Sequence, residues 1–361
     1  MITALYIISF AFVSIIFIVS LSNLFSAPVL KIKSSAQNKL VSILIPARNE
    51  ERNIQACLDG CLTQTYTNKE IIVLDDNSTD NTLEILNTYS YKIKIINGKQ
   101  LPEDWLGKNW ACSQLAQHAQ GDYLLFIDAD VRLNNNAVES AVEEITLTNS
   151  ALISVFPTQK IKSFSEWLIV PLMNWLLLGF LPLVLVYSSR NKSFVAANGQ
   201  FMLWRKEIYD KLGGHSSLKY EPVEDMEFAR ICKSKGIKLK TLLGGKLIFC
   251  RMYSNLKEAI NGFAKNFFAG FKTNAIGFLI FISLISLSSL LPLIIWKNLY
   301  YSAILSTMII LSRIFISIKS NQNILMNLIL HPFQMMMVFI IGIISIYKTK
   351  FGKLEWKERK I

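Results

Sequence analysis

Charged side chains are scarce in this sequence of 361 residues. Asp, Glu, Lys and Arg together make up 18% of it, whereas hydrophobic residues make up 52%. Soluble proteins usually carry about 25% charged residues. Glycine and proline are also few, at 16 and 9 residues. This composition excludes a disordered chain, a collagen and a solvated repeat array.

Acidic residues are the rarer of the two signs. The chain has 38 Lys and Arg residues against 26 Asp and Glu, which gives a formal net charge of +12. Because long apolar stretches lie near both ends of the chain, we interpret the positive charge as attraction to anionic lipid. We therefore expect a membrane partner and no nucleic-acid partner.

Cysteine is too rare and too irregularly spaced for a disulfide scaffold or a zinc site. The five cysteines form an odd set without a C-x-x-C pair, which favours a reducing compartment. Cys57 and Cys61 share a helical face with Ile54 and Leu58. This spacing predicts that both thiols pack in the core.

Charge is absent from Thr3 to Phe25, a stretch long enough to cross a bilayer as a helix. We interpret residues 1–30 as a membrane anchor and not a cleaved signal peptide, because no Lys or Arg precedes the apolar run. Lys31, Lys33 and Lys39 follow it. The positive-inside rule then places the next domain in the cytoplasm.

Three more apolar segments lie in residues 276–347, which we expect to form a C-terminal membrane region. Ile276–Trp296 and Leu328–Tyr347 are the better candidates for spans. Leu299–Ile318 contains Arg313, so we expect it to lie at the interface or to turn back. An even number of crossings then returns the basic tail, residues 348–361, to the cytoplasm. The sequence thus predicts a multi-pass protein of the cell membrane.

A further uncharged segment, at 164–187, lies inside the central region 31–275. It is long enough to span a bilayer. A crossing there would place the acidic motifs before and after it on opposite sides of the membrane. We therefore expect an interfacial or re-entrant element, with a buried core helix as the alternative.

The central region alternates apolar strands, polar turns and helices, which predicts an α/β fold with a parallel sheet. Strands are expected at Val41–Pro46, Glu70–Leu74, Lys92–Ile96 and Tyr123–Ile127. Ligands of such sheets bind beyond the carboxyl ends of the strands. The polar residues at the ends of the first two strands are Arg48, Asn49, Glu50, Asp75 and Asp76.

Acidic pairs follow at two later positions. Asp128 and Asp130 come directly after the strand Tyr123–Ile127, and two carboxylates so placed can hold a divalent ion that neutralises a diphosphate. Glu224 and Asp225 open a predicted helix, where favourable interaction with the helix dipole is the alternative explanation. Lys108 lies at the start of another helix, where it can meet a phosphate.

Four motifs in this order resemble the family 2 glycosyltransferases of the GT-A fold. They are Ile-Pro-Ala-Arg-Asn-Glu at 45–50, Leu-Asp-Asp-Asn-Ser-Thr-Asp at 74–80, Phe-Ile-Asp-Ala-Asp at 126–130 and Glu-Asp-Met-Glu at 224–227. The resemblance covers residues 40–274 and implies a Rossmann-like nucleotide-diphospho-sugar transferase domain between N- and C-terminal transmembrane helices. Patterns at 107–111, 197–200 and 356–359 are similar to the membrane-anchored branch that glycosylates small lipids. That branch includes enzymes acting on carotenoid acids such as diaponeurosporenoate, and related hopanoid-associated enzymes.

The resemblance also implies residue roles. Asp128 and Asp130 would hold Mg²⁺ or Mn²⁺ on the donor diphosphate, Asp76 would recognise the nucleobase, and Asp225 would be the general base, with Glu224 beside it in the catalytic pair. The residues implied in donor binding are Pro46, Arg48, Asn49, Glu50, Asp76, Lys108 and Asp128.

The implied reaction is an inverting transfer of a hexose, for which we expect glucose, from a UDP-sugar to a lipid-soluble acceptor. A polyprenyl phosphate or a glycerolipid is the alternative acceptor, and a catalytically silent membrane scaffold is the alternative outside this class. The Gln-x-x-Arg-Trp motif of polymerising members is missing, which argues against processive synthesis. We interpret Arg251 and Lys265 as solvated surface residues in preference to diphosphate ligands.

Overall fold

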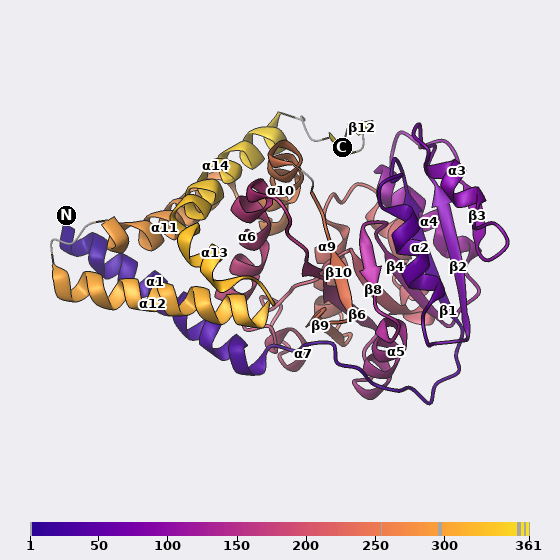
Figure 1. Ribbon diagram of the computed structural model, residues 1–361, viewed down its shortest axis with the longest axis horizontal. Helices are drawn as coiled ribbons and strands as arrows, with labels where there is room; N and C mark the ends of the chain where they lie inside the picture. Colours follow the sequence, from indigo (N-terminus) through magenta and orange to yellow (C-terminus); the bar gives the residue numbers. More distant parts are fainter. Residues whose placement is uncertain (1, 254, 295–297, 352–354, 357–358, 361) are drawn as a thin grey trace.

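The computed structural model describes residues 2–253, 255–294, 298–351, 355–356 and 359–360. Figure 1 shows a sheet domain at one end of the molecule and a group of long helices at the other. The strands are β1 (Val41–Ala47), β2 (Lys69–Asp75), β3 (Lys94–Asn97), β4 (Tyr123–Ile127), β5 (Val131–Leu133), β6 (Leu152–Phe156), β7 (Thr158–Gln159), β8 (Phe201–Arg205), β9 (Leu239–Leu243), β10 (Ile248–Cys250), β11 (Glu355–Trp356) and β12 (Arg359–Lys360). The helices are α1 (Ile2–Ser26), α2 (Ile54–Leu62), α3 (Thr82–Asn87), α4 (Gly107–His118), α5 (Ala137–Leu147), α6 (Phe164–Phe180), α7 (Leu185–Ser188), α8 (Lys206–Lys211), the 3₁₀ helix η1 (Gly214–Leu218), α9 (Glu224–Ser234), α10 (Leu256–Phe271), α11 (Ala275–Ile294), α12 (Leu299–Lys319), α13 (Ile324–Ile329) and α14 (His331–Lys350).

The main sheet has seven strands in the order β3-β2-β1-β4-β8-β6-β9. Strands β3, β2, β1 and β4 run parallel, and this is the strand order of a nucleotide-binding half of a Rossmann fold. Strand β8 then pairs antiparallel with both β4 and β6. The four strands expected from the sequence correspond to β1, β2, β3 and β4. The antiparallel strand β8 carries the loop 195–200 to the end of β4.

Alternation along the central strands sends apolar side chains into two cores. Ile43 and Ile45 of β1 face helices α2, α3 and α5, whereas Leu44 faces the opposite side. The second core continues without a break from the sheet into α6, α10, α11 and α14. All five cysteines are buried free thiols, and Cys57 and Cys61 pack in the first core as predicted.

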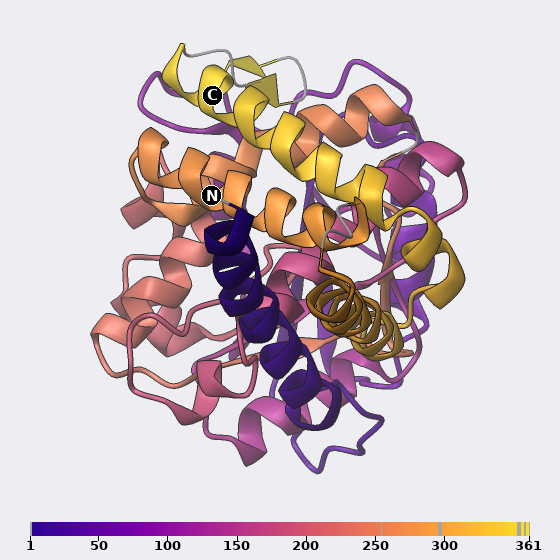
Figure 2. The same ribbon diagram turned by 90° about the vertical axis from the view of Figure 1, so that its left-hand side faces the viewer.

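Four helices in the described part of the chain are long and apolar enough to cross a membrane. They cover Tyr6–Ser26, Ala275–Pro292, Leu299–Lys319 and His331–Lys350. Figure 1 shows α1 beside α12, in contact along their lengths. In Figure 2, α12 is seen nearly end-on while α14 runs across the view. Helix α14 instead packs on α10 and α11.

Three features of the helical region bear on the expected spans, whose placement in a membrane stays a prediction. Leu299–Ile318, expected to lie at the interface or to turn back, is part of the continuous helix α12 beside α1, so the chain does not turn back within it. The expected span Leu328–Tyr347 is divided, because α13 ends before His331 and Pro332 begins α14. Helix α6 contacts α1, α10, α12, α13 and α14, and it is enclosed like the core helix that was the alternative for 164–187. Within the tail 348–361 and the pattern at 356–359, residues 352–354, 357–358 and 361 lie outside the described residues.

One buried amide of α1 is hydrogen-bonded to the end of α6. Asn23 Nδ2 donates to the carbonyl oxygens of Leu178 at 2.9 Å and Leu181 at 2.7 Å, and its Oδ1 accepts from Leu183 N–H at 2.9 Å. The carbonyls at the end of a helix lack partners within it. Asn23 therefore satisfies the end of α6 from a neighbouring helix.

We predict that Asn23→Leu destabilises the protein by on the order of 3 kcal/mol, because it leaves three buried backbone groups without a partner in an apolar setting. The substitution keeps the side-chain size and raises the hydrophobicity of α1, so insertion into the membrane is unaffected. Thermal unfolding in detergent measures the loss. Ser22→Ala, one residue away on the exposed face of α1, is the control. Equal Tm values for both variants would show that Asn23 does not hold α6.

Candidate active site

The site begins where β4 ends, between β1 and β8. Strand β4 is buried throughout, so Asp128 follows directly on a rigid element. The Asp128 N–H donates to the Gln200 carbonyl at 3.3 Å, and its own carbonyl accepts from Val131 N–H at 3.0 Å. This turn presents Asp128 and Asp130 at the carboxyl edge of the sheet, where ligands of α/β proteins bind.

Lys108 is the cation of the site. Its Nζ lies 2.9 Å from Asp128 Oδ1 and 3.2 Å from Glu224 Oε1. The ammonium group therefore joins the end of β4 to the start of α9. The neighbouring Asn109 fixes the first turn of α4, since its Nδ2 donates to the carbonyl oxygens of Leu218 at 2.6 Å and Glu221 at 3.0 Å.

Gly199 packs at the centre of these charged groups. A Cβ atom at this position would lie 3.0 Å from Lys108 Nζ, 3.1 Å from Glu224 Oε1 and 3.5 Å from Asp225 Oδ2. The Gly199 N–H donates to Asp225 Oδ2 at 2.7 Å, and Met226 N–H donates to Asp225 Oδ1 at 2.7 Å. Asp225 is thus held by two backbone groups, and a side chain at position 199 would displace its neighbours.

Burial and like charge raise the pKa of two carboxyl groups. The pKa of Asp130 is raised to about 7 by burial and by its neighbours Asp128 and Glu50. The pKa of Asp225 is also raised to about 7, by burial and by Glu224, although Lys108 and the two backbone N–H donors oppose this rise. Both groups therefore exchange protons near neutral pH.

Glu224 stays ionised between these groups. Burial alone would raise its pKa, but Lys108 and then His215 lower it below the ordinary value. Burial lowers the pKa of His215 to about 4, so the imidazole is neutral at pH 7. His215 packs edge-on against Phe126 with ring centroids 4.9 Å apart. His215 and Phe126 thus form an aromatic contact next to Glu224.

The chemistry of Asp128, Asp130 and Gln200 fits a divalent cation. Asp128 and Asp130 are half-buried, and the charge of Asp128 raises the pKa of Asp130. A cation would stabilise both carboxylates, and Mg²⁺ and Mn²⁺ prefer oxygen ligands. Gln200 Nε2 lies 3.4 Å from Asp130, and the buried Gln200 Oε1 has no hydrogen-bond partner. No cluster of three or more His, Cys, Asp or Glu ligands occurs among the described residues. Oxygen atoms of a ligand would have to complete the coordination.

The residues predicted for donor binding lie at the ends of β1 and β2. Arg48 Nη1 donates to the carbonyl oxygens of Asp76 at 2.6 Å and Asn77 at 2.9 Å. Asn49, which has a φ of 53°, accepts from Thr79 N–H at 2.9 Å. These contacts hold the turn after β2 against the turn after β1, with Asp76 buried between them. Pro46 lies in β1 opposite Leu74.

Three residues that were not predicted for the site lie near its acids or in contact with α6. Lys265 of α10 is half-buried, and burial lowers its pKa to about 8 against the opposing effects of Glu224, Asp128 and Asp225. The solvated position expected for it is therefore wrong. Tyr253 lies near Asp130, whose charge adds to burial in raising the tyrosine pKa. Arg251 pairs with buried Glu166 of α6 at 2.7 Å. No local motif marks these residues, because the pairing of strands and helices brings them together.

Comparison with known proteins finds a family match in the sheet domain and similar proteins along the chain. Residues 42–213 match a family described as Glycosyl transferase family 2. A 4,4'-diaponeurosporenoate glycosyltransferase of Staphylococcus haemolyticus is 28% identical over 233 residues, which are 64% of this chain and 61% of that protein. A protein of the same name from Staphylococcus aureus is 26% identical over 339 residues, or 90% of this chain and 88% of its own.

A solved structure has the same fold over nearly the whole chain. It is a mannosyltransferase from Pyrobaculum calidifontis in complex with GDP-Man and Mn²⁺, with a TM-score of 0.53, 13% sequence identity, and coverage of 97% of this chain and 99% of its own. The likeness shows the fold alone. Together with the mixed sheet, it confirms the predicted GT-A fold with apolar helices in both terminal regions.

We predict that Lys108→Met destabilises the protein by about 3 kcal/mol at pH 8, because it removes the cation that contacts the half-buried carboxylate of Asp128 and the buried carboxylate of Glu224. Without Lys108, the pKa of Glu224 rises above its unfolded value, and the pKa of Asp128, which burial already raises, rises further. The loss is then small at pH 5 and grows as the pH rises through these pKa values.

Thermal unfolding in detergent with EDTA, at pH 5 and pH 8, measures this pH dependence. The control is Lys206→Met, which breaks an exposed pair with Asp210 and should cost less than about 1 kcal/mol. A loss for Lys108→Met that is the same at both pH values would contradict the role of the two acids.

Proposed function

Since this chain is a glycosyltransferase with a family 2 domain at residues 42–213, we propose that it transfers one hexose, glucose, from a UDP-sugar to a lipid-soluble acceptor at the membrane. The transfer inverts the anomeric carbon in a single displacement. One observation carries the proposal: Lys108, Glu224 and Asp225 converge on Gly199, beside the acids at the end of β4. The names of the relatives in Staphylococcus support the acceptor class.

The donor binds along the carboxyl ends of β1, β2 and β4. Asp76 recognises the nucleobase, and the turn residues Arg48, Asn49 and Glu50 shape the edge of the pocket. The diphosphate then reaches Lys108 and Lys265, whose positive charges face the same acids. Asp128 and Asp130 hold Mg²⁺ or Mn²⁺, which, when bound, offsets the charge of the departing nucleoside diphosphate.

Asp225 receives the acceptor proton. Its pKa near 7 is close to the working pH, where a positioned base is most effective. A lipid acid that enters apolar surroundings is favoured in its neutral form, and Asp225 can then take its proton. An acceptor that arrives as a carboxylate needs the base less than a hydroxyl group does. Gly199 N–H and Met226 N–H fix both carboxylate oxygens and so orient the base.

The acceptor, which we propose is a carotenoid acid such as diaponeurosporenoate, approaches from the bilayer through α10. This helix brings Lys265 to the catalytic acids on one side, and on the other its phenylalanines Phe267 and Phe271 pack on Phe278 of α11. Phe271, Ile276 and Leu279 are exposed on these two helices. They give a long apolar acceptor a surface that leads toward the polar reaction centre.

The sheet domain faces the cytoplasm, in our proposal, with the N-terminus of α1 outside. Helices α11 and α12 form the paired crossing, since α12 lies beside α1. Helix α14, which runs across the view of Figure 2 where α12 is nearly end-on, then lies near the cytoplasmic surface. The number of crossings after the catalytic domain is then even. Lys348 and Lys350 at the end of α14 return to the side of Lys31 and Lys33, as the positive-inside rule requires.

Turnover of radiolabelled UDP-glucose in membranes, with and without EDTA, tests this function. The mass of the lipid extract identifies the acceptor by a hexose increment.

We predict that Asp128→Ala and Asp130→Ala abolish metal-stimulated turnover, because each removes a carboxylate ligand of the cation. Asp210→Ala, the same change at an exposed surface pair, should leave turnover unchanged. Normal metal-dependent turnover in both site variants would show that the metal binds elsewhere.

We predict that Asp225→Asn lowers the transfer rate by about 10²–10⁴ while the KM for UDP-glucose stays within about twofold, because an amide cannot accept the proton. The amide oxygen replaces only one of the two carboxylate acceptors, so a small loss of Tm accompanies the change.

The matched control is Glu227→Gln on the same helix, whose side chain pairs with Arg230 and Lys272 at the surface. Near-normal transfer by Asp225→Asn would eliminate it as the base. Equal loss of donor binding and transfer would move its role to the donor site.

A further inference from the structure

A pocket lies away from the catalytic acids, between the apolar helices and the sheet domain. Its volume is about 290 Å³, and its lining comes from the end of α1, the segment after it, α5, β9 and the last residue of α12. The charged residues in the lining are Lys31, Lys33, Lys240, Lys319 and Glu144. None of these residues takes part in the proposed transfer reaction.

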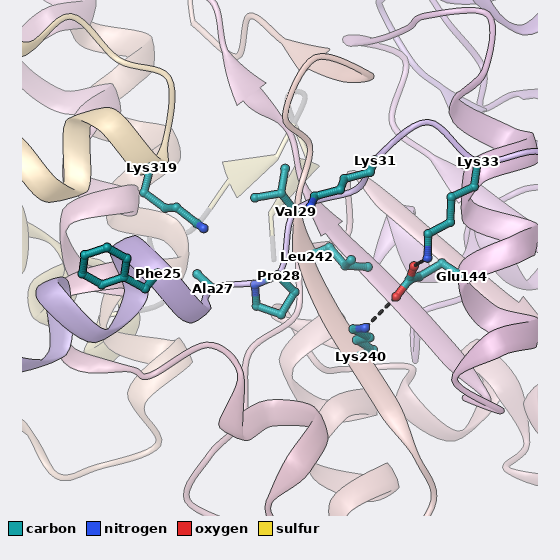
Figure 3. A pocket seen from close by; sticks show the side chains of 10 residues that line it. All are labelled: Phe25, Ala27, Pro28, Val29, Lys31, Lys33, Glu144, Lys240, Leu242 and Lys319. Atoms are coloured by element: carbon teal, nitrogen blue, oxygen red, sulfur yellow. Dashed lines mark hydrogen bonds and ion pairs between the residues drawn. The ribbon is translucent and has the colours of Figure 1, made fainter.

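The charges in this pocket do not balance. Glu144 pairs with Lys33 at 2.5 Å and with Lys240 at 2.6 Å, so the single acid is already shared by two lysines. In the described part of the chain, Lys31 and Lys319 form no ion pair; Lys319 Nζ donates only to the Leu24 carbonyl at 3.3 Å. Figure 3 shows these two lysines on either side of Val29. Four cations and one anion leave an excess of positive charge around a hollow, which favours an anionic ligand.

The pocket lies at the level where two candidate spans end. One span ends at Ser26 and the other at Lys319 itself. Phe25, which is 80% exposed, lies at the rim, where its apolar ring can contact lipid. The pocket is therefore at headgroup depth on the side of the sheet domain.

The backbone around the pocket is rigid. Residues Pro28 to Leu30 continue the sheet beyond β9, since Leu30 N–H donates to the Leu243 carbonyl and Leu243 N–H donates to the Pro28 carbonyl, both at 2.9 Å. This pairing fixes the backbone at Lys31 relative to the backbone at Lys240. Two of the lysines in the pocket are thus carried by one hydrogen-bonded sheet edge.

We propose that this pocket binds the phosphate of an anionic phospholipid headgroup. Lys31 and Lys319 contact the phosphate from two sides, and Lys33 and Lys240 add positive charge from behind Glu144. The lipid chains extend beside α1 and α12, and Phe25 packs at the glycerol level. The proposal depends on the membrane placement of α1 and α12 and not on the sugar transfer reaction.

The test uses the full-length protein in neutral detergent and measures lipid retained after exchange against phosphatidylglycerol or phosphatidylcholine. Wild-type protein should retain phosphatidylglycerol selectively, and added phosphatidylglycerol should raise its Tm. The double variant Lys31→Gln/Lys319→Gln should lose about 30-fold in affinity, about fivefold for each lysine near a charged membrane surface. Lys92→Gln/Lys94→Gln, the same change of charge at exposed positions around β3, should behave as wild type.

Equal retention of phosphatidylglycerol by both double variants would overturn the proposal, as would equal retention of the two lipids by wild-type protein. A rise of Tm with soluble glycerol phosphate that matches the rise with phosphatidylglycerol would replace the lipid by a free phosphate ligand. Turnover of UDP-glucose is measured on the same preparations. If lipid selectivity is absent while turnover continues, the pocket assignment fails and the glycosyltransferase assignment stands.

Discussion

The contact between Lys108 and its two acids determines how the catalytic region is assembled. Asp128 belongs to the end of a parallel strand and Glu224 to the start of a helix nearly a hundred residues later, and one ammonium group joins them. Each carboxylate would be costly to bury alone. Lys108 offsets the burial of Glu224 and part of that of Asp128. Asp225 lies half-buried beside them, where burial and Glu224 raise its pKa to about 7. Gly199 leaves room for these charged groups, because a Cβ atom at this position would lie within 3.5 Å of Lys108, Glu224 and Asp225.

Much of this site was predictable from sequence because its parts lie at the ends of regular elements. A buried strand followed by acids, as at Asp128 and Asp130, needs only local pattern and the rule that ligands bind at carboxyl edges. Lys265 and Tyr253 were not predictable in this way. Both follow β10, and their distance from the acids depends on how α10 packs on α6 and α14. Such packing involves residues far apart in the sequence, and a local pattern does not encode it.

The packing of the apolar helices was also not predictable from local sequence patterns. Arg313 argued against a buried span by its charge, yet α12 is one continuous helix, and Arg313 Nε donates to the Asn327 carbonyl at 3.4 Å. A polar contact from the following helix is invisible to hydropathy, which counts residues one at a time. Helix α6 was ambiguous for a similar reason, since its composition suits either a bilayer or a protein interior. Only its neighbours distinguish the two.

The strand-like pairing of Pro28 to Leu30 with β9 has a consequence for substrate choice. The first residues after α1 join the sheet at once, so no flexible tether separates the anchor from the catalytic domain. If α1 spans the membrane and the acceptor is a lipid, as we propose, the reaction centre stays at a constant height above the bilayer. Lipids would then be distinguished by how far their reactive end emerges from the membrane, independently of the chemistry of that end.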